Sequence, residues 1–274
     1  MPAITDWDDA YANGPHIPDA QSYPPRWATA ATAFRGARDA GRRQLDQVYG
    51  PGARQRFDLF LPGRTPHGLV VFVHGGYWMA FDKSSWSHLA EGPLTAGWAV
   101  ALPSYTLCPE ARISGITREI AQAIAVAARA VDGPIRLAGH SAGGHLVTRM
   151  ACTDTPIDPA IQARIDRVLS ISGLHDLRPL LRTKMNETLG LDEEEAMNES
   201  AALGMPVDSV RLLCRVGALE RPEFRRQNAL LANIWRGLGN DGDAGEAAGR
   251  HHFDVIEELQ AGDSVSTEFL TATS

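Results

Sequence analysis

A serine between two glycines is the part of the sequence best suited to chemistry. Ser141 stands in Gly139-His140-Ser141-Ala142-Gly143, a G-x-S-x-G pattern. The apolar run 135–138 before it predicts a short buried strand, and residues 144–150 predict the start of a helix. In such a strand–turn–helix the serine backbone is strained, and glycine on both sides avoids collisions. The pattern predicts a nucleophile elbow with the Ala142 amide facing an anion at the helix N-terminus; the alternative is a Gly/Ser turn without that role.

Two further glycines follow an apolar run at residues 69–73, which predicts a central strand buried on both faces. Their amides can point into the space above the sheet, so Gly75 and Gly76 are candidate oxyanion donors together with Ala142. The alternative is an ordinary Gly-Gly loop. We assign His74 to fixing this loop by a hydrogen bond and not to proton transfer.

Aromatic residues follow the two glycines at once. Tyr77 and Trp78 could wall an acyl or aryl pocket because they adjoin the candidate donors, and Phe81 is a weaker candidate. The alternative is that they pack the loop.

An acid and a histidine follow the serine in the order expected for a triad. The run 210–217 predicts a strand, and Glu220 is the first carboxylate after it, although a solvated surface acid is the alternative. Glu223 fits better as a charge in the first turn of a helix. His252 precedes a predicted helix at 255–259 with Asp254 as its N-cap, and Phe253 is expected to fix the imidazole. A metal pair of His251 and His252 is the rival, but no third ligand stands at a suitable spacing.

These motifs resemble those of the α/β-hydrolase superfamily. Within it the chain resembles the arylformamidase (kynurenine formamidase) group and related carboxylesterases, through segments 74–78, 139–146, 216–224 and 252–253, and the likeness runs from about Phe57 to Leu259. The resemblance implies Ser141 as nucleophile, His252 as base, Glu220 as acid, and Gly75, Gly76 and Ala142 as oxyanion donors. Asp is common at the acid position, so Glu220 is a departure from the pattern.

The remaining elements must position these groups. Strands and helices alternate from about residue 69 to 172, which predicts an α/β-hydrolase fold: a mostly parallel, doubly wound sheet with helices on both faces. We expect one domain over 1–274, with an N-terminal arm and helix in 1–45 and a lid or surface excursion in 175–209. Residues 55–61 predict a half-buried edge strand and 84–96 a helix. Residues 239–249 predict a mobile loop, and the last strand before residue 250 is not identified.

Composition limits the function classes. The 274 residues are 44% hydrophobic and 22% charged, with a net charge of −7, which argues against nucleic-acid and membrane partners. No apolar run reaches the length of a membrane span, and no signal peptide is evident. Three scattered cysteines suit a reducing cytoplasm. We expect a small-molecule substrate, no cofactor and no metal, and leave a homodimer open.

The sequence therefore predicts a serine hydrolase that cleaves a small aryl formamide of the N-formylkynurenine type by acyl transfer to water. A carboxylesterase for short acyl esters is the alternative within the same chemistry. A hydrolase scaffold that binds a ligand without catalysis is the alternative of another class.

Overall fold

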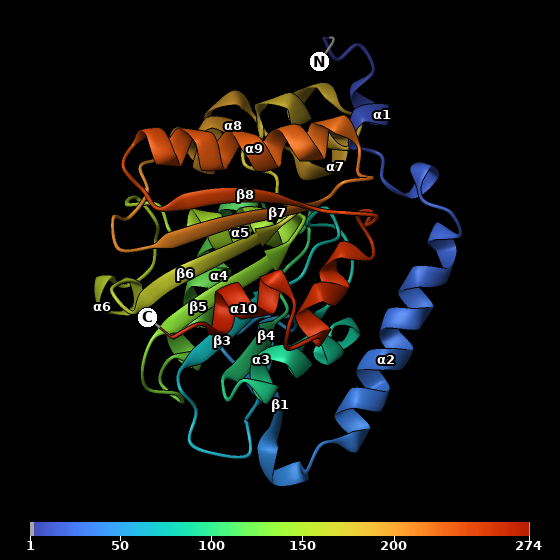
Figure 1. Cartoon of the computed structure of the whole chain (residues 1–274). Helices are drawn as coiled ribbons and strands as arrows, with labels where there is room; N and C mark the ends of the chain where they lie inside the picture. Colours follow the sequence, from blue (N-terminus) through green and yellow to red (C-terminus); the bar gives the residue numbers. More distant parts are fainter. Residues whose placement is uncertain (1–2, 274) are drawn as a thin grey trace.

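The computed structural model describes residues 3–273; residues 1, 2 and 274 of the predicted single domain lie outside the described part. The chain is built on an eight-stranded sheet in the order β1-β2-β4-β3-β5-β6-β7-β8 (Figure 1). The first two pairings, β1 with β2 and β2 with β4, are antiparallel, and the others are parallel. The strands are β1 Arg43–Val48, β2 Arg56–Phe60, β3 Leu69–Val73, β4 Ala99–Pro103, β5 Ile135–His140, β6 Ile165–Ile171, β7 Arg211–Gly217 and β8 Gly242–Ala247.

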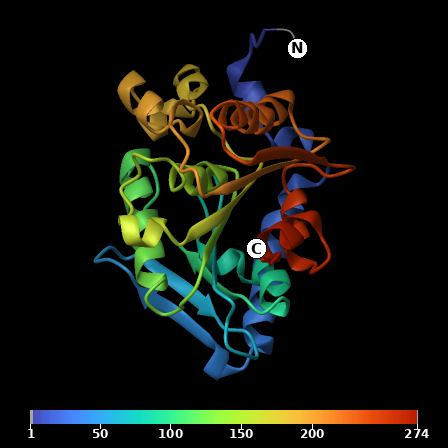
Figure 2. The same cartoon turned by 60° about the vertical axis from the view of Figure 1, so that its left-hand side comes forward.

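Helices cover both faces of the sheet, as the turned view in Figure 2 shows. The reason is the period of two along each strand: Leu69, Val71 and Val73 of β3 face one apolar core, while Val70 and Phe72 face the other. Helices α4, α5 and α9 pack on the first core, and α2, α3 and α10 on the second. The helices are α1 Trp7–Tyr11, α2 Tyr23–Ala37, α3 Glu91–Thr95, α4 Ile113–Ala127, α5 Ala142–Arg149, α6 Pro159–Gln162, α7 Asn186–Leu189, α8 Glu193–Asn198, α9 Pro222–Gly237 and α10 Val265–Thr271.

The predicted fold class is confirmed: this is an α/β-hydrolase fold with a mostly parallel sheet. The carboxyl ends of β3, β5, β6 and β7 lie along one edge, because these strands are parallel and adjacent. The segments after these four strands contain the candidate groups identified in the sequence.

Secondary-structure predictions on the N-terminal side need correction at three places. The helix expected within residues 1–45 is present, but it ends at Ala37 and is followed by β1. Residues 55–61 are consequently not at the edge, since β2 lies between β1 and β4 and is buried. Residues 84–96 form short 3-10 turns before α3, because Pro93 lacks the N–H that a continuous helix would need and fits only in a first turn.

The prediction of a mobile loop at 239–249 was also wrong. Residues Gly242–Ala247 form β8, parallel to β7 over six Cα partners, from Leu212–Gly242 to Gly217–Ala247. The sequence GDAGEA has almost no intrinsic strand preference, so pairing with β7 and packing under α9 decide its conformation. This is the last strand that the sequence did not identify.

Residues 175–209 consist of short helices, including α7 and α8. The acidic run at 192–195 opens α8, where Asp192 accepts a hydrogen bond from the Glu195 amide at 2.8 Å. The role of the insertion as a lid stays a prediction.

Candidate active site

Ser141 lies at a sharp turn between β5 and α5. Its φ is 56° and its ψ is −118°, a strained conformation for a residue with a side chain. A Cβ built on Gly139 would stand 2.1 Å from the Gly143 carbonyl oxygen, and one on Gly143 would stand 2.0 Å from the Val73 carbonyl oxygen. Only glycine fits either position, which is the steric condition expected for a nucleophile elbow.

The loop after β3 comes close to this serine. A Cβ built on Gly75 would lie 2.9 Å from the Ser141 Cβ, so the Gly75 backbone passes directly beside the nucleophile candidate. Gly76 has a φ of 107°, which favours glycine. Within the described residues the amides of Gly75, Gly76 and Ala142 have no hydrogen-bond acceptor. They are therefore unpaired among the described residues, and their role as oxyanion donors stays a prediction.

His74 holds this loop in place. Its Nδ1 donates to the Gly75 carbonyl at 2.7 Å, and its ring stacks on Tyr105 with centroids 4.4 Å apart. The Tyr105 hydroxyl donates to the His74 carbonyl oxygen at 3.0 Å. Burial lowers the pKa of His74 to about 4, so the imidazole is neutral at pH 7. The assignment of His74 to fixing the loop is confirmed.

Glu220 and His252 form a buried pair. His252 Nδ1 lies 2.6 Å from Glu220 Oε2, and both residues are largely buried, at 3% and 6% exposure. The second carboxylate oxygen, Oε1, accepts hydrogen bonds from Ser172 Oγ at 2.6 Å and from the Gly217 amide at 2.7 Å. Because the carboxylate is held on both oxygens, it fixes the imidazole and leaves Nε2 as the free ring nitrogen.

The imidazole of His252 is brought to the elbow by its neighbours. His140, the residue before Ser141, has its ring centroid 4.7 Å from that of His252, and its Nε2 donates to the His252 carbonyl oxygen at 2.9 Å. Phe224 at the start of α9 packs on the other side, with ring centroids 4.6 Å apart. The predicted contact with Phe253 is longer, at 6.1 Å. Phe224 was missed because only the packing of α9 on β7 brings it there.

The structure adds detail for three residues near the site. Asp254 stands at the N-cap of the 3-10 helix Val255–Gln260 but accepts from the His251 amide at 2.7 Å, not from the helix. His251 Nε2 contacts the Tyr23 hydroxyl at 3.0 Å, so this ring is turned to α2. Glu223 lies in the first turn of α9, as predicted, and it is buried there and accepts a hydrogen bond from the Tyr11 hydroxyl at 2.7 Å.

The two residues predicted to wall a pocket, Tyr77 and Trp78, lie in different surroundings. Trp78 is fully buried, at 0% exposure, and its ring packs edge-on against His145 in the core, so the prediction that it walls a pocket was wrong. Tyr77 and Trp78 have successive positive φ values of 53° and 58°, and their side chains contact different parts of the chain. Tyr77 borders a cavity of about 270 Å³.

Segments of the N-terminal arm reach this site, which the sequence did not indicate. The Tyr77 hydroxyl donates to the Tyr11 carbonyl oxygen at 2.6 Å and accepts from Asn13 Nδ2 at 2.9 Å. The expected extended arm instead contains α1, and Tyr11 is buried against Phe224. A polar sequence such as Asp6–Gly14 offers no local signal for a contact made across more than sixty residues.

Comparisons with known proteins place the chain among hydrolases. The BD-FAE family model matches residues 57–215, more than half of the chain. Kynurenine formamidase of Danio rerio is 28% identical over 235 residues, covering 81% of this chain and 79% of the relative. Kynurenine formamidase of Drosophila melanogaster is 27% identical over 293 residues, covering 98% and 97%.

Solved structures give the same fold. A proposed thioesterase from Silicibacter sp. TM1040 is 52% identical, with a TM-score of 0.93 over 97% of this chain and 99% of its own. An esterase of Pyrobaculum calidifontis is 16% identical, with a TM-score of 0.71 over 97% and 96%. The second likeness concerns the fold alone.

Proposed function

The chain belongs to the BD-FAE family, and from this premise and the site geometry we propose that it is a serine hydrolase using Ser141, His252 and Glu220. The observation that carries the proposal is the 2.6 Å contact between His252 Nδ1 and Glu220 Oε2 beside the elbow that bears Ser141. A carboxylate on one ring nitrogen orients the other toward a nucleophile and stabilises the imidazolium that forms.

In the proposed reaction Ser141 Oγ attacks the substrate carbonyl carbon while His252 Nε2 takes the hydroxyl proton. The carbonyl oxygen becomes an oxyanion and accepts hydrogen bonds from the amides of Gly75, Gly76 and Ala142. Collapse of this tetrahedral species breaks the bond to the leaving amine or alcohol, which takes the proton from His252. Water, deprotonated by the same imidazole, then releases the acyl group and restores Ser141. These reaction steps need no cofactor or metal.

We propose a small aryl formamide of the N-formylkynurenine type as the substrate. The relatives that are 26–28% identical bear the name kynurenine formamidase, and they cover most of the chain. A carboxylesterase acting on short acyl esters is the second candidate, since proteins of the same fold are esterases. A binding protein without catalysis is disfavoured, because Glu220 and His252 are already paired beside the elbow.

The comparison that decides between the two substrates is kcat/KM for N-formylkynurenine against that for p-nitrophenyl acetate. We expect the formamide to be preferred. A large preference for the ester would replace the formamidase by the esterase, and unchanged hydrolysis by Ser141→Ala would exclude the serine mechanism altogether.

Two further properties belong to the proposal. The helices within residues 3–273 lack the combination of length and apolar character that a membrane-spanning helix requires. Cys108, Cys152 and Cys214 are free and buried, which supports a reducing compartment, and we propose the cytoplasm. A homodimer stays a prediction that the mass of the protein in solution would check.

A further inference from the structure

Ser172 carries a fully buried hydroxyl whose partner is the proposed triad acid. The residue follows β6 directly and is 0% exposed, and its Oγ lies 2.6 Å from Glu220 Oε1. Because an ionised carboxylate only accepts hydrogen bonds, the hydroxyl is the donor. A hydrogen bond to a charged group is stronger than one between neutral groups, and removal from water strengthens it further. The contact is therefore one of the stronger interactions that a serine side chain can make.

The backbone fixes the position of this hydroxyl. Ser172 has a φ of 53°, in the left-handed region that favours glycine. Its amide donates to the Arg215 carbonyl oxygen at 2.7 Å, which continues the pairing of β6 with β7 by one residue. The next residue, Gly173, packs on α5, since a Cβ built on Gly144 would stand 2.8 Å from the Gly173 Cα. A strained backbone at a residue with a side chain indicates a use for that side chain, and here the side chain binds Glu220.

The Glu220 carboxylate is bound differently on its two oxygens. Oε1 accepts from Ser172 Oγ and from the Gly217 amide, at 2.6 and 2.7 Å, while Oε2 lies 2.6 Å from His252 Nδ1. The two donors on Oε1 oppose any rotation that would turn Oε2 away from the imidazole. This restraint matters more for a glutamate than for an aspartate, because glutamate has one more rotatable bond to hold.

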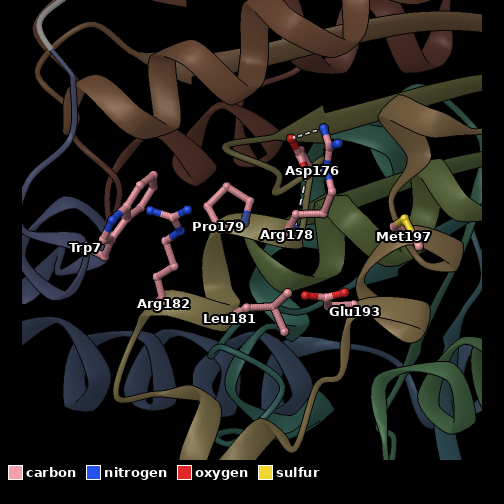
Figure 3. A pocket seen from close by; sticks show the side chains of 8 residues that line it. All are labelled: Trp7, Asp176, Arg178, Pro179, Leu181, Arg182, Glu193 and Met197. Atoms are coloured by element: carbon pink, nitrogen blue, oxygen red, sulfur yellow. Dashed lines mark hydrogen bonds and ion pairs between the residues drawn. The ribbon is translucent and has the colours of Figure 1, made fainter.

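An arginine or lysine does not take the place of this hydroxyl. Within residues 3–273, the ion pairs give Glu220 no partner other than His252. The segment after β6 contains Arg178, but Asp176 binds it through two contacts of 2.9 Å, and both line a cavity of about 640 Å³ without a triad residue (Figure 3). Among the described residues, Ser172 and His252 are therefore the two side chains that bind the Glu220 carboxylate.

We propose that Ser172 is a positioning residue, which holds the Glu220 carboxylate directed at His252 and acts on Ser141 only through this pair. The inference rests on the proposed function and adds to the proposed triad a residue that supports its acid. Ser172 binds the carboxylate oxygen that does not face the imidazole, so its loss should affect kcat and leave KM unchanged.

The experiment removes the hydroxyl in two ways. Ser172→Ala keeps a side chain on the strained backbone, whereas Ser172→Gly places glycine at a φ that glycine favours. Both should lower kcat about tenfold, with KM within about twofold of wild type, on the faster of N-formylkynurenine and p-nitrophenyl acetate. In urea, Ser172→Gly should unfold at a midpoint equal to or above that of Ser172→Ala. An equal loss of kcat in both variants then separates the hydrogen bond from stability.

Ser170→Ala is the matched control. Ser170 is also 0% exposed and lies two residues earlier, in β6, but its Oγ contacts His175 Nε2 at 3.3 Å and not the proposed acid. The same hydroxyl is thus removed from the same strand, and kcat should stay within about twofold of wild type.

A double variant supplies a readout that a purely structural role would not change. In the Glu220→Gln background the charge that Ser172 positions is already absent, so adding Ser172→Ala should lower kcat by less than about twofold further. Two independent roles would instead multiply the two losses.

The outcomes separate this inference from the proposed function. If wild type is active but both Ser172 variants keep kcat within twofold, or only the less stable one loses activity, or the losses multiply with that of Glu220→Gln, Ser172 is not a positioning residue and the serine mechanism stands. Failure of both variants to fold would assign the hydroxyl to stability and would also overturn the inference. If wild type hydrolyses neither substrate and a phosphonate does not label Ser141, the proposed function fails and the positioning role fails with it.

Discussion

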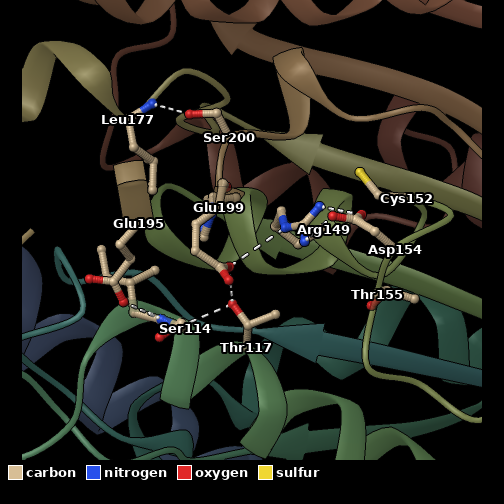
Figure 4. A network of polar contacts seen from close by, with 12 residues as sticks. Ser114, Thr117, Arg149, Cys152, Asp154, Thr155, Leu177, Glu195, Glu199 and Ser200 are labelled. Carbon is tan, nitrogen blue, oxygen red and sulfur yellow. Dashed lines mark hydrogen bonds and ion pairs between the residues drawn. The ribbon is translucent and has the colours of Figure 1, made fainter. Parts of the chain in front are cut away.

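Two buried groups in this protein contain the same ingredients, a glutamate, a histidine and a hydroxyl, and only in one of them does the carboxylate pair with the imidazole. In the first, Glu220 binds His252 Nδ1 at 2.6 Å and the Ser172 hydroxyl at 2.6 Å. In the second, shown in Figure 4, Glu199 accepts from the Thr117 hydroxyl at 2.6 Å and lies 3.5 Å from Arg149 Nε. His145 is near Glu199 but donates to its backbone carbonyl, at 2.7 Å.

The two groups differ in the side chain with which each carboxylate pairs. Glu199 is neutralised by the buried guanidinium of Arg149 and ties α8 to α4 and α5, so it serves the packing of these helices. The ion pairs among the described residues give Glu220 no Arg or Lys partner, and its charge acts on the imidazole of His252. A fully buried histidine that donates to a neutral carbonyl oxygen, as His145 does, is not stabilised as a cation. A histidine that is paired with a carboxylate can become a cation during a reaction.

If the two groups differ in role, the largest loss of activity is expected for the variant Glu220→Gln. The side chain keeps its volume but loses the charge that orients and stabilises the His252 imidazolium. We expect kcat to fall by about a hundredfold to ten-thousandfold, with a smaller change in KM. Steady-state kinetics on the better of the two proposed substrates measures this, and activity within threefold of wild type would show that Glu220 is not the acid.

The matched change in the other group is Glu199→Gln. It leaves Arg149 paired only with the more exposed Asp154, and removing one partner of a buried pair costs up to about 3–5 kcal/mol of unfolding free energy. Urea unfolding measures the loss, and kcat/KM should stay within threefold of wild type. A loss of activity as large as that of Glu220→Gln, in a protein that remains folded, would mean that the two groups do not differ in role.

A smaller effect is expected from pH. Burial lowers the pKa of His145 to about 3 and of His74 to about 4, against 6.5 for an exposed imidazole. The unfolded chain therefore binds more protons between about pH 4 and 6.5, so stability is full above pH 6.5 and falls as the pH drops through this window. Each such histidine contributes at most about 1.4 kcal/mol per pH unit.

The unfolding midpoint in urea should thus be lower at pH 5 than at pH 7, and His145→Gln should reduce the difference. An equal pH dependence in wild type and His145→Gln would argue against the burial of a neutral imidazole at this position.

The sequence predicted the central strands and the elbow because local signals and tertiary environment agree there. Residues 69–73 and 135–138 are apolar runs that are buried on both faces. The glycines at 139 and 143 are required because a side chain at either position would collide with nearby backbone. Glu220 and His252 were identified from their order after strands, and the structure pairs them.

The misses have a common cause, which is that distant parts of the chain decide the local structure. β8 is a strand only because β7 is beside it, and Trp78 is a core residue because its ring packs against His145 of α5. The contacts of Tyr11 and Asn13 with Tyr77 join segments far apart in the sequence. Hydrophobic patterns and residue propensities depend on neighbours along the chain, so they cannot predict such long-range contacts.

Labelling by a serine-reactive phosphonate, followed by peptide mass mapping, tests the central claim most directly. The account predicts one adduct per chain on Ser141, no adduct in Ser141→Ala, and labelling of Glu220→Gln that is much slower than that of wild type. An adduct on another residue, or equal labelling of wild type and Ser141→Ala, would contradict it.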